Sequence, residues 1–115
     1  MGAKLLVVDD DQDVRLVVED TLVDAGYRVL QAEGGAQALL LLDEHPPLRV
    51  MISDVRMPDM SGITLAEEAV RRRPDLRVIL ISGFIDQVRP RWPFLRKPFL
   101  SSRLCDLVAR EMRRA

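Results

Sequence analysis

The stretch Val50-Met51-Ile52-Ser53-Asp54-Val55-Arg56-Met57-Pro58 begins as a short apolar run and continues into a serine, an aspartate and a loop-forming proline. Short apolar runs rich in β-branched residues are typical of strands buried on both faces of a parallel sheet. Similar runs occupy residues 5–8, 78–81 and, more weakly, 27–30, and a shorter one, Phe94-Leu95-Arg96, precedes a Lys-Pro pair. We therefore expect five strands.

Segments with helical periodicity separate these runs. The first apolar stripe is Val14, Val17, Val18, Leu22 and Ala25, with Gly26 as C′ residue, and the second is Ala38, Leu39 and Leu42, ending at Pro46-Pro47. The third is Leu65, Ala66, Ala69 and Val70, capped by Ser61 and closed by Pro74. The fourth is Leu104, Leu107, Val108 and Met112, capped near Ser101 or Ser102. Strands that alternate with helices predict an α/β fold, in which helices cover both faces of a parallel sheet.

The size and charge of the chain limit the possible functions. A length of 115 residues suits one domain, which we expect to span residues 1–115. With 17 basic and 18 acidic side chains the net charge is −1, so we expect no nucleic-acid binding by this chain alone. The apolar runs are too short to span a membrane, and the single Cys105 excludes an internal disulfide. We expect a cytoplasmic protein with a packed, structural thiol at Cys105.

Polar residues follow the predicted strands at the points where the strands end. Asp9, Asp10 and Asp11 follow the first strand, Asp54 the third, Ser82 and Gly83 the fourth, and Lys97 and Pro98 the last. Because the carboxyl ends of parallel strands share one edge of the sheet, where such folds bind ligands, we expect these side chains to converge.

Converging carboxylates repel one another unless a cation neutralises them. Oxygen ligands of this kind suit Mg²⁺, which would also neutralise the oxygens of an incoming phosphoryl group. A lysine and a hydroxyl would add further contacts, and an aspartate that attacks phosphorus forms an acyl phosphate. The sequence thus predicts phosphoryl acceptance by Asp54, with Ser82 and Lys97 assisting.

Some charged residues have simpler interpretations. Asp11 or Asp13 is expected to cap the first helix. The basic runs at residues 71–73 and 113–114 lie near predicted helix C-termini, where cations complement the helix dipole. The lone His45 is interpreted as a solvated residue at a helix end.

The sequence resembles the receiver domains of two-component response regulators along essentially its whole length. The matching stretches are Leu6-Val7-Val8-Asp9-Asp10, Ser53-Asp54-Val55-Arg56-Met57-Pro58-Asp59-Met60-Ser61-Gly62, Ile81-Ser82-Gly83 and Lys97-Pro98-Phe99. The resemblance implies a flavodoxin-like, doubly wound sheet of five parallel strands in the order 2-1-3-4-5. It also implies phosphotransfer from a histidine kinase or a histidine phosphotransfer protein.

The resemblance implies a role for each residue of the site. Asp54 is the phosphoacceptor, and the metal ligands are Asp10, Asp9 alongside it, Asp54 and the backbone carbonyl of Arg56. Ser82 is the switch hydroxyl and Phe94 the aromatic switch residue. Lys97 contacts the phosphoryl group, and the Lys97–Pro98 peptide bond is expected to be cis.

The segment between the fourth and fifth strands departs from the family pattern. Ten residues, 83–92, leave no room for a full fourth helix, since a crossover with its helix needs about 10–12 residues. We expect a shortened helix around residues 84–88 or an irregular loop, which puts signalling through that face in doubt. Trp92 is expected to fill the space, or else to anchor a partner. The apolar Phe84 cannot position an attacking water, so we predict slow self-dephosphorylation and faster hydrolysis when an acidic or amide residue replaces Phe84.

Other functions compete with this interpretation. A small Mg²⁺-dependent phosphatase with an aspartate nucleophile would use the same chemistry, but no cap segment is visible. An FMN-binding module would need a phosphate loop where the chain has three aspartates. A receiver-like interaction module that is never phosphorylated would not need all of Asp9, Asp10, Asp54, Ser82 and Lys97. The short segment before the fifth strand favours, by resemblance, an origin in a hybrid kinase.

Overall fold

The computed structural model of the protein describes residues 4–83 and 91–115. Five parallel strands lie in one sheet: β1 (Lys4–Val8), β2 (Arg28–Ala32), β3 (Leu48–Asp54), β4 (Arg77–Ser82) and β5 (Phe94–Arg96). Four helices connect or follow them: α1 (Gln12–Asp24), α2 (Gly35–Glu44), α3 (Gly62–Arg72) and α4 (Ser101–Arg114). The strand order is β2-β1-β3-β4-β5, which confirms the predicted fold class.

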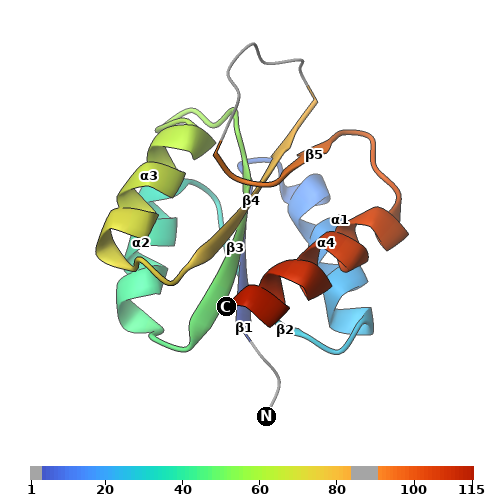
Figure 1. Ribbon diagram of the computed structural model, residues 1–115. Coiled ribbons are helices and arrows are strands. Elements are labelled where there is room, and N and C mark those ends of the chain that lie inside the picture. Colours follow the sequence, from blue (N-terminus) through green and yellow to red (C-terminus); the bar gives the residue numbers. More distant parts are fainter. Residues whose placement is uncertain (1–3, 84–90) are drawn as a thin grey trace.

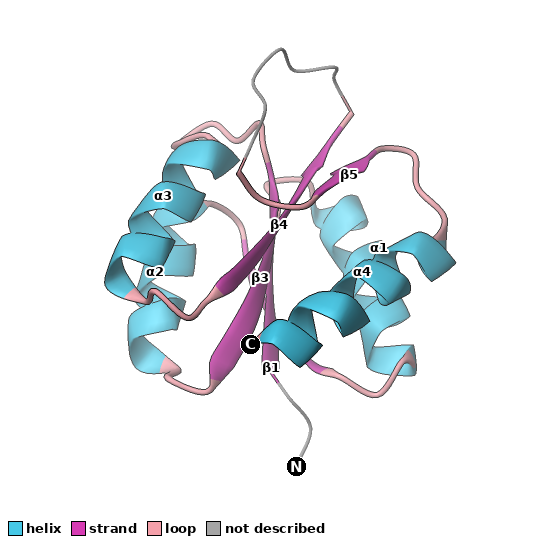
Figure 2. Cartoon of the chain, viewed as in Figure 1, coloured by secondary structure: helices cyan, strands magenta, loops and turns pink. Residues whose placement is uncertain are grey.

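The helices form a layer on each face of the sheet, with α2 and α3 on one side and α1 and α4 on the other (Figures 1 and 2). Two clusters of buried side chains correspond to these two interfaces. Alternation along β3 divides its side chains between them, since Met51 packs toward α2 and α3 while Ile52 packs toward α1 and α4. This burial on both faces is the reason that the central strands have continuous apolar sequences.

The helix boundaries agree with the predicted capping signals in most places. Asp11 accepts hydrogen bonds from the backbone N–H groups of Asp13 and Val14 and so caps α1, and Ser61 caps α3 by accepting from Thr64. Gly26 has a φ of 98°, a left-handed conformation that glycine adopts without a steric penalty.

Three local predictions were wrong. The first helix does not bury its whole stripe, because Val17 is 63% exposed while Val18 and Leu22 are buried. The last helix is capped by Leu100 instead of a serine, and Leu100 makes no side-chain capping bond. The second strand begins at Arg28, one residue later than predicted.

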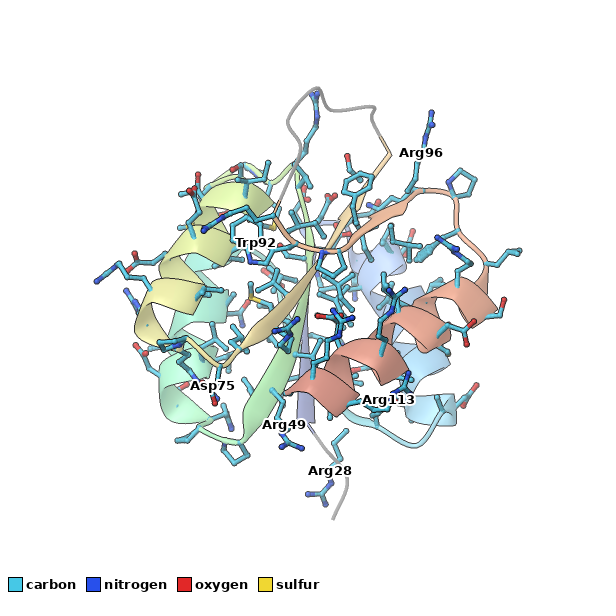
Figure 3. All side chains as sticks on the ribbon, viewed as in Figure 1. Arg28, Arg49, Asp75, Trp92, Arg96 and Arg113 are labelled. Carbon is cyan, nitrogen blue, oxygen red and sulfur yellow. The ribbon has the colours of Figure 1, made fainter. Side chains whose placement is uncertain are left out.

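The segment before β5 is only partly described. Residues 84–88, where we expected a shortened helix, lie outside the described residues. The same holds for Phe84, on which the prediction of slow self-dephosphorylation rests. Trp92 is half-buried against the core on the α2 and α3 face, as its position in Figure 3 shows, in agreement with the space-filling interpretation. The Arg91 guanidinium lies 4.8 Å from the centroid of the Trp92 ring. Within residues 4–83 and 91–115, no helix combines the length and hydrophobicity needed to cross a membrane.

Candidate functional site

Three carboxylates meet at the edge of the sheet formed by the strand C-termini. Asp9 and Asp10 directly follow β1, and Asp54 is the last residue of β3, the strand adjacent to β1. One carboxylate oxygen from each of these residues lies within 4.8 Å of the others. Asp9 is 4% exposed, the Asp54 side chain is 11% exposed, and Asp10 is exposed. The cluster is therefore anchored in the protein on one side and open to solvent on the other.

Hydrogen bonds fix Asp9 at both its backbone and its side chain. Its N–H donates to the carbonyl of Ala32 at 3.1 Å, and its Oδ1 accepts from the N–H of Asp11 at 2.9 Å. Its carbonyl accepts from the Arg15 guanidinium at 2.8 Å. Asp9 is thus held in one orientation at the base of the cluster.

Lys97 brings a positive charge to two of the carboxylates. Its Nζ lies 3.3 Å from Asp9 Oδ2 and 3.5 Å from Asp54 Oδ1. The backbone N–H of Lys97 donates to the carbonyl of Ser82 at 2.8 Å, and the Lys97–Pro98 peptide bond is cis, as predicted. A single ammonium group thus faces a cluster of three carboxylates.

The electrostatic balance of the cluster is visible in the pKa of Asp54. Partial burial raises the pKa of this carboxyl above its ordinary value, and the charge of Asp9 raises it further, while Lys97 opposes both effects. Three carboxylates here face one ammonium group, that of Lys97. An all-oxygen donor set with excess negative charge fits a hard divalent cation such as Mg²⁺.

The backbone around Asp54 is packed too closely to allow a larger residue at Gly62. A Cβ atom at Gly62 would lie 2.1 Å from the carbonyl oxygen of Asp54. The N–H of Gly62 donates to the carbonyl of Val55 at 2.8 Å, and the N–H of Val55 donates to that of Ile81 at 2.9 Å. This close approach connects the start of α3 to the end of β3.

The remaining predicted residues lie on neighbouring elements. Ser82 is 1% exposed and ends β4, one residue beyond Ile81, which pairs with Asp54. Phe94 begins β5, pairs with Leu80 and is half-buried against the core. Arg56 is exposed and lines an open cavity of about 620 Å³ together with Asp10 and the loop that precedes α3. The sheet thus brings Asp9, Asp10, Asp54, Ser82 and Lys97 to one edge, while Phe94 lies further back, at the start of β5.

Sequence reasoning missed two residues that support the site. Arg15, 7% exposed, bonds to the carbonyl of Asp9, and the exposed Asp59 binds the N-terminus of α2. Arg15 had a detectable signal, since it lies three and seven residues before the buried Val18 and Leu22 and is therefore a charge on the buried stripe of α1. Asp59 had none, because its partners on α2, Gly35 and Ala36, are more than 20 residues away in the sequence.

Comparison with known proteins agrees with this geometry. The response regulator receiver domain family matches residues 5–109, and the chain belongs to this family. It is 38% identical to the response regulator receiver protein CpdR of Brucella abortus over 112 residues, covering 91% of this chain and 90% of CpdR. It is 34% identical to the chemotaxis protein CheY of Bacillus subtilis, covering 94% of this chain and 96% of CheY.

A hybrid kinase contains a similar domain. The chain is 33% identical to part of the sensor kinase CckA of Brucella abortus, covering 93% of this chain but only 12% of the kinase. The crystal structure of the receiver domain of a hybrid histidine kinase CckA aligns with a TM-score of 0.84 and 33% identity, covering 95% of this chain and 98% of that domain. The receiver fold thus occurs both in proteins of this length and within longer ones.

Proposed function

We propose that the protein accepts a phosphoryl group on Asp54 from the phosphohistidine of a histidine kinase or a histidine phosphotransfer protein. The observation that carries the proposal is the position of Asp54 Oδ1, 3.5 Å from Lys97 Nζ and within the same cluster as Asp9 and Asp10. A carboxylate surrounded in this way has a cation to neutralise an incoming phosphoryl group on one side and metal ligands on the other.

The transfer is a single displacement at phosphorus. A carboxylate oxygen of Asp54 forms the new P–O bond while the P–N bond to the donor histidine breaks, and the electron pair of that bond leaves with the imidazole. Asp9, Asp10, Asp54 and the carbonyl of Arg56 would hold Mg²⁺, which supplies neutralisation of the phosphoryl oxygens when it is bound. Lys97 stabilises the charge that the acyl phosphate adds.

The proposed response to phosphorylation uses Ser82 and Phe94. The new group carries up to roughly two negative charges, which attract hydrogen-bond donors and cations. Ser82 donates its hydroxyl proton toward the phosphoryl oxygens, and Phe94, on the neighbouring β5, adjusts its packing. These changes alter the surface that partner proteins bind.

A groove beside the site offers a contact surface for the donor protein. It has a volume of about 460 Å³ and lies between α1 and the segment from Lys97 to Ser101. Its rim includes the exposed Val17, and Leu100 beside it is 70% exposed. An apolar patch that borders Lys97 is positioned to bind a donor while its phosphohistidine reaches Asp54.

Labelling by a small-molecule donor tests the chemistry. Radiolabelled acetyl phosphate is expected to label the wild type stoichiometrically in the presence of Mg²⁺, with no labelling of Asp54→Asn. Asp75→Asn, at an exposed site far from the cluster, is the matched control and should be labelled like the wild type. Absence of labelling would favour the receiver-like module that is never phosphorylated, and steady release of phosphate would favour the phosphatase.

Transfer from candidate kinases tests the docking surface. Val17→Asp should slow transfer from the kinase at least tenfold while leaving labelling by acetyl phosphate unchanged, because only the protein donor needs the groove. Leu40→Asp is the control, since Leu40 is 57% exposed on α2, on the other side of the sheet. Equal effects of the two substitutions on transfer would exclude docking at α1.

A further inference from the structure

A buried cation, Arg15, lies beneath the acidic cluster. It is 7% exposed, its NH1 group donates to the carbonyl of Asp9 at 2.8 Å, and its Nε donates to Gln31 Oε1 at 3.0 Å. Gln31 in turn donates to Glu19 on the next turn of α1. Among the described residues, no carboxylate lies within ion-pair distance of this guanidinium. Burying a guanidinium group is costly, and here its partners are one backbone carbonyl and one side-chain amide oxygen, with no carboxylate among them.

That carbonyl determines the direction of the chain at Asp10. The peptide unit is planar, so fixing the carbonyl oxygen of Asp9 fixes the plane that contains the nitrogen and Cα of Asp10. The N–H of Asp9 is already bonded to Ala32, and its carboxylate to Asp11 and Lys97. The carboxylate of Asp10 is exposed and forms no hydrogen bond with any of the described residues. The Arg15 bond therefore orients Asp10 together with the bond from the Asp11 N–H to Asp9 Oδ1, which spans Asp10.

We propose that Arg15 is a positioning residue for the metal ligands: by holding the peptide plane between Asp9 and Asp10, it keeps the Asp10 carboxylate near those of Asp9 and Asp54 and raises the affinity of the cluster for a divalent cation. The inference rests on the proposed function, in which this cluster binds Mg²⁺. Partners that orient metal ligands without touching the metal have this effect in other metal sites.

The charge of Arg15 and its bond to Asp9 have opposite effects on the affinity of the cluster for a divalent cation. A guanidinium close to the cluster repels a divalent cation, so its removal by itself would strengthen metal binding. Loss of the bond to Asp9 frees the peptide plane and weakens metal binding. The sign of the measured change therefore decides between the two effects.

Calorimetric titration of the unphosphorylated protein with Mg²⁺ provides the test. Arg15→Met is expected to weaken Mg²⁺ binding about tenfold or more. Arg15→Lys retains the charge but loses the planar fork that bonds Asp9 and Gln31 together, and should also weaken binding. Gln31→Met removes the second anchor of the guanidinium, along with the bond to Glu19, and leaves the bond to Asp9, so it should have a smaller effect in the same direction.

A second measurement separates positioning from general destabilisation. In labelling by acetyl phosphate, Arg15→Met should need more Mg²⁺ for half-maximal rate, while its rate at saturating Mg²⁺ approaches that of the wild type. Arg77→Met is the matched control, because it removes a guanidinium from the opposite end of the sheet. It should lower stability and leave Mg²⁺ affinity unchanged.

The outcomes distinguish this inference from the proposed function. Unchanged or tighter Mg²⁺ binding by Arg15→Met, in the presence of a wild type that binds Mg²⁺ and is labelled, would overturn the positioning role alone. A wild type that neither binds Mg²⁺ nor is labelled would overturn both. If Arg15→Met does not fold, Arg15→Lys and Gln31→Met decide the matter by the same titration.

Discussion

Asp59 caps helix α2 from outside that helix: its Oδ2 accepts a hydrogen bond from the backbone N–H of Ala36 at 3.0 Å, although 23 residues separate the two. Its Oδ1 accepts from Gly35 at 3.2 Å. The N-cap residue, Gly34, has no side chain to make this contact, and a Cβ there would lie 2.8 Å from Asp59 Oδ1. The loop that carries Asp54 into α3 is therefore bonded directly to α2.

Removing this cap should destabilise the fold. Asp59→Ala is expected to lower the free energy of unfolding by about 1 kcal/mol, the usual value of an N-cap carboxylate. The bond from Ala36, with those from Gly35 and Met60, lowers the pKa of Asp59. A lowered pKa in the folded state means that the stabilisation is present above the unfolded pKa of about 3.9 and is lost as the pH falls through the folded value.

Urea unfolding at pH 7 and pH 3 measures this effect. The difference between wild type and Asp59→Ala should be full at pH 7 and smaller at pH 3. Asp75→Ala is the control, because Asp75 is exposed and points away from the sheet in Figure 3. A difference that does not change with pH would show that the charge of Asp59 is not involved.

Asp54 is expected to cost the protein stability when no metal is bound. Its pKa is raised, chiefly by burial and then by Asp9, so its ionised form is disfavoured in the folded state. The cost is absent below the unfolded pKa of about 3.9, appears as the pH rises above it, and is complete above the folded pKa. Asp54→Asn should therefore be more stable than the wild type at pH 7 without Mg²⁺, and the gain should vanish near pH 3.

Thermal unfolding with and without Mg²⁺ checks this prediction. Mg²⁺ should stabilise the wild type more than Asp54→Asn, because only the wild type retains all three carboxylates. If Asp54→Asn is less stable than the wild type at pH 7 without metal, the electrostatic explanation is contradicted.

A buried carboxylate joins α4 to the sheet at the end opposite the site. Glu111 is 1% exposed, and its Oε1 lies 3.1 Å from Nε of Arg77, the first residue of β4. The side chain of Arg77 is 35% exposed, and Arg114 lies 3.8 Å from Oε2 of Glu111, which has no hydrogen bond. This ion pair is therefore only partly satisfied.

Removing one partner of this ion pair should lower the free energy of unfolding more than replacing both partners with apolar residues. Arg77→Met leaves the carboxylate buried without its main partner and should lower the free energy of unfolding by about 2 kcal/mol, below the full value for a buried pair because water reaches Arg77. The double variant Arg77→Met, Glu111→Leu should recover most of that loss, since it leaves no buried charge. Denaturant unfolding of the single and double variants measures the coupling; a double variant as unstable as Arg77→Met would contradict it.

Gly62 tests whether the backbone of Asp54 tolerates displacement. Gly62→Ala places a methyl group against the Asp54 carbonyl oxygen, so the backbone must move, at a cost of about 3 kcal/mol. We expect lower stability and slower labelling of Asp54 at saturating Mg²⁺. Gly83→Ala is the control near the same site, because among the described residues the nearest atom to its Cβ would be Lys97 Cβ, at 3.9 Å. Normal labelling of a folded Gly62→Ala protein would show that the close approach does not position Asp54.

The sequence by itself determined the strands, the helices and the edge of the sheet where the chemistry lies. Short, continuous apolar runs rich in β-branched residues are typical of strands buried on both faces, and parallel strands place their C-terminal residues together. Asp9, Asp54 and Lys97 were therefore predictable from local pattern. The exposure of Val17 and the absence of a serine cap on α4 were not, because both depend on how the helices pack against other elements.

Only the tertiary structure decided which partners the polar groups of the helices and loops meet. Arg15 bonds to a carbonyl six residues away, Asp59 to an amide 23 residues away, and Glu111 to a side chain 34 residues away. Each of these contacts joins a helix to a strand or loop, so it exists only once the layers have packed. Local periodicity places a residue on a face of its own element, but the partner it meets there is set by the order of the strands.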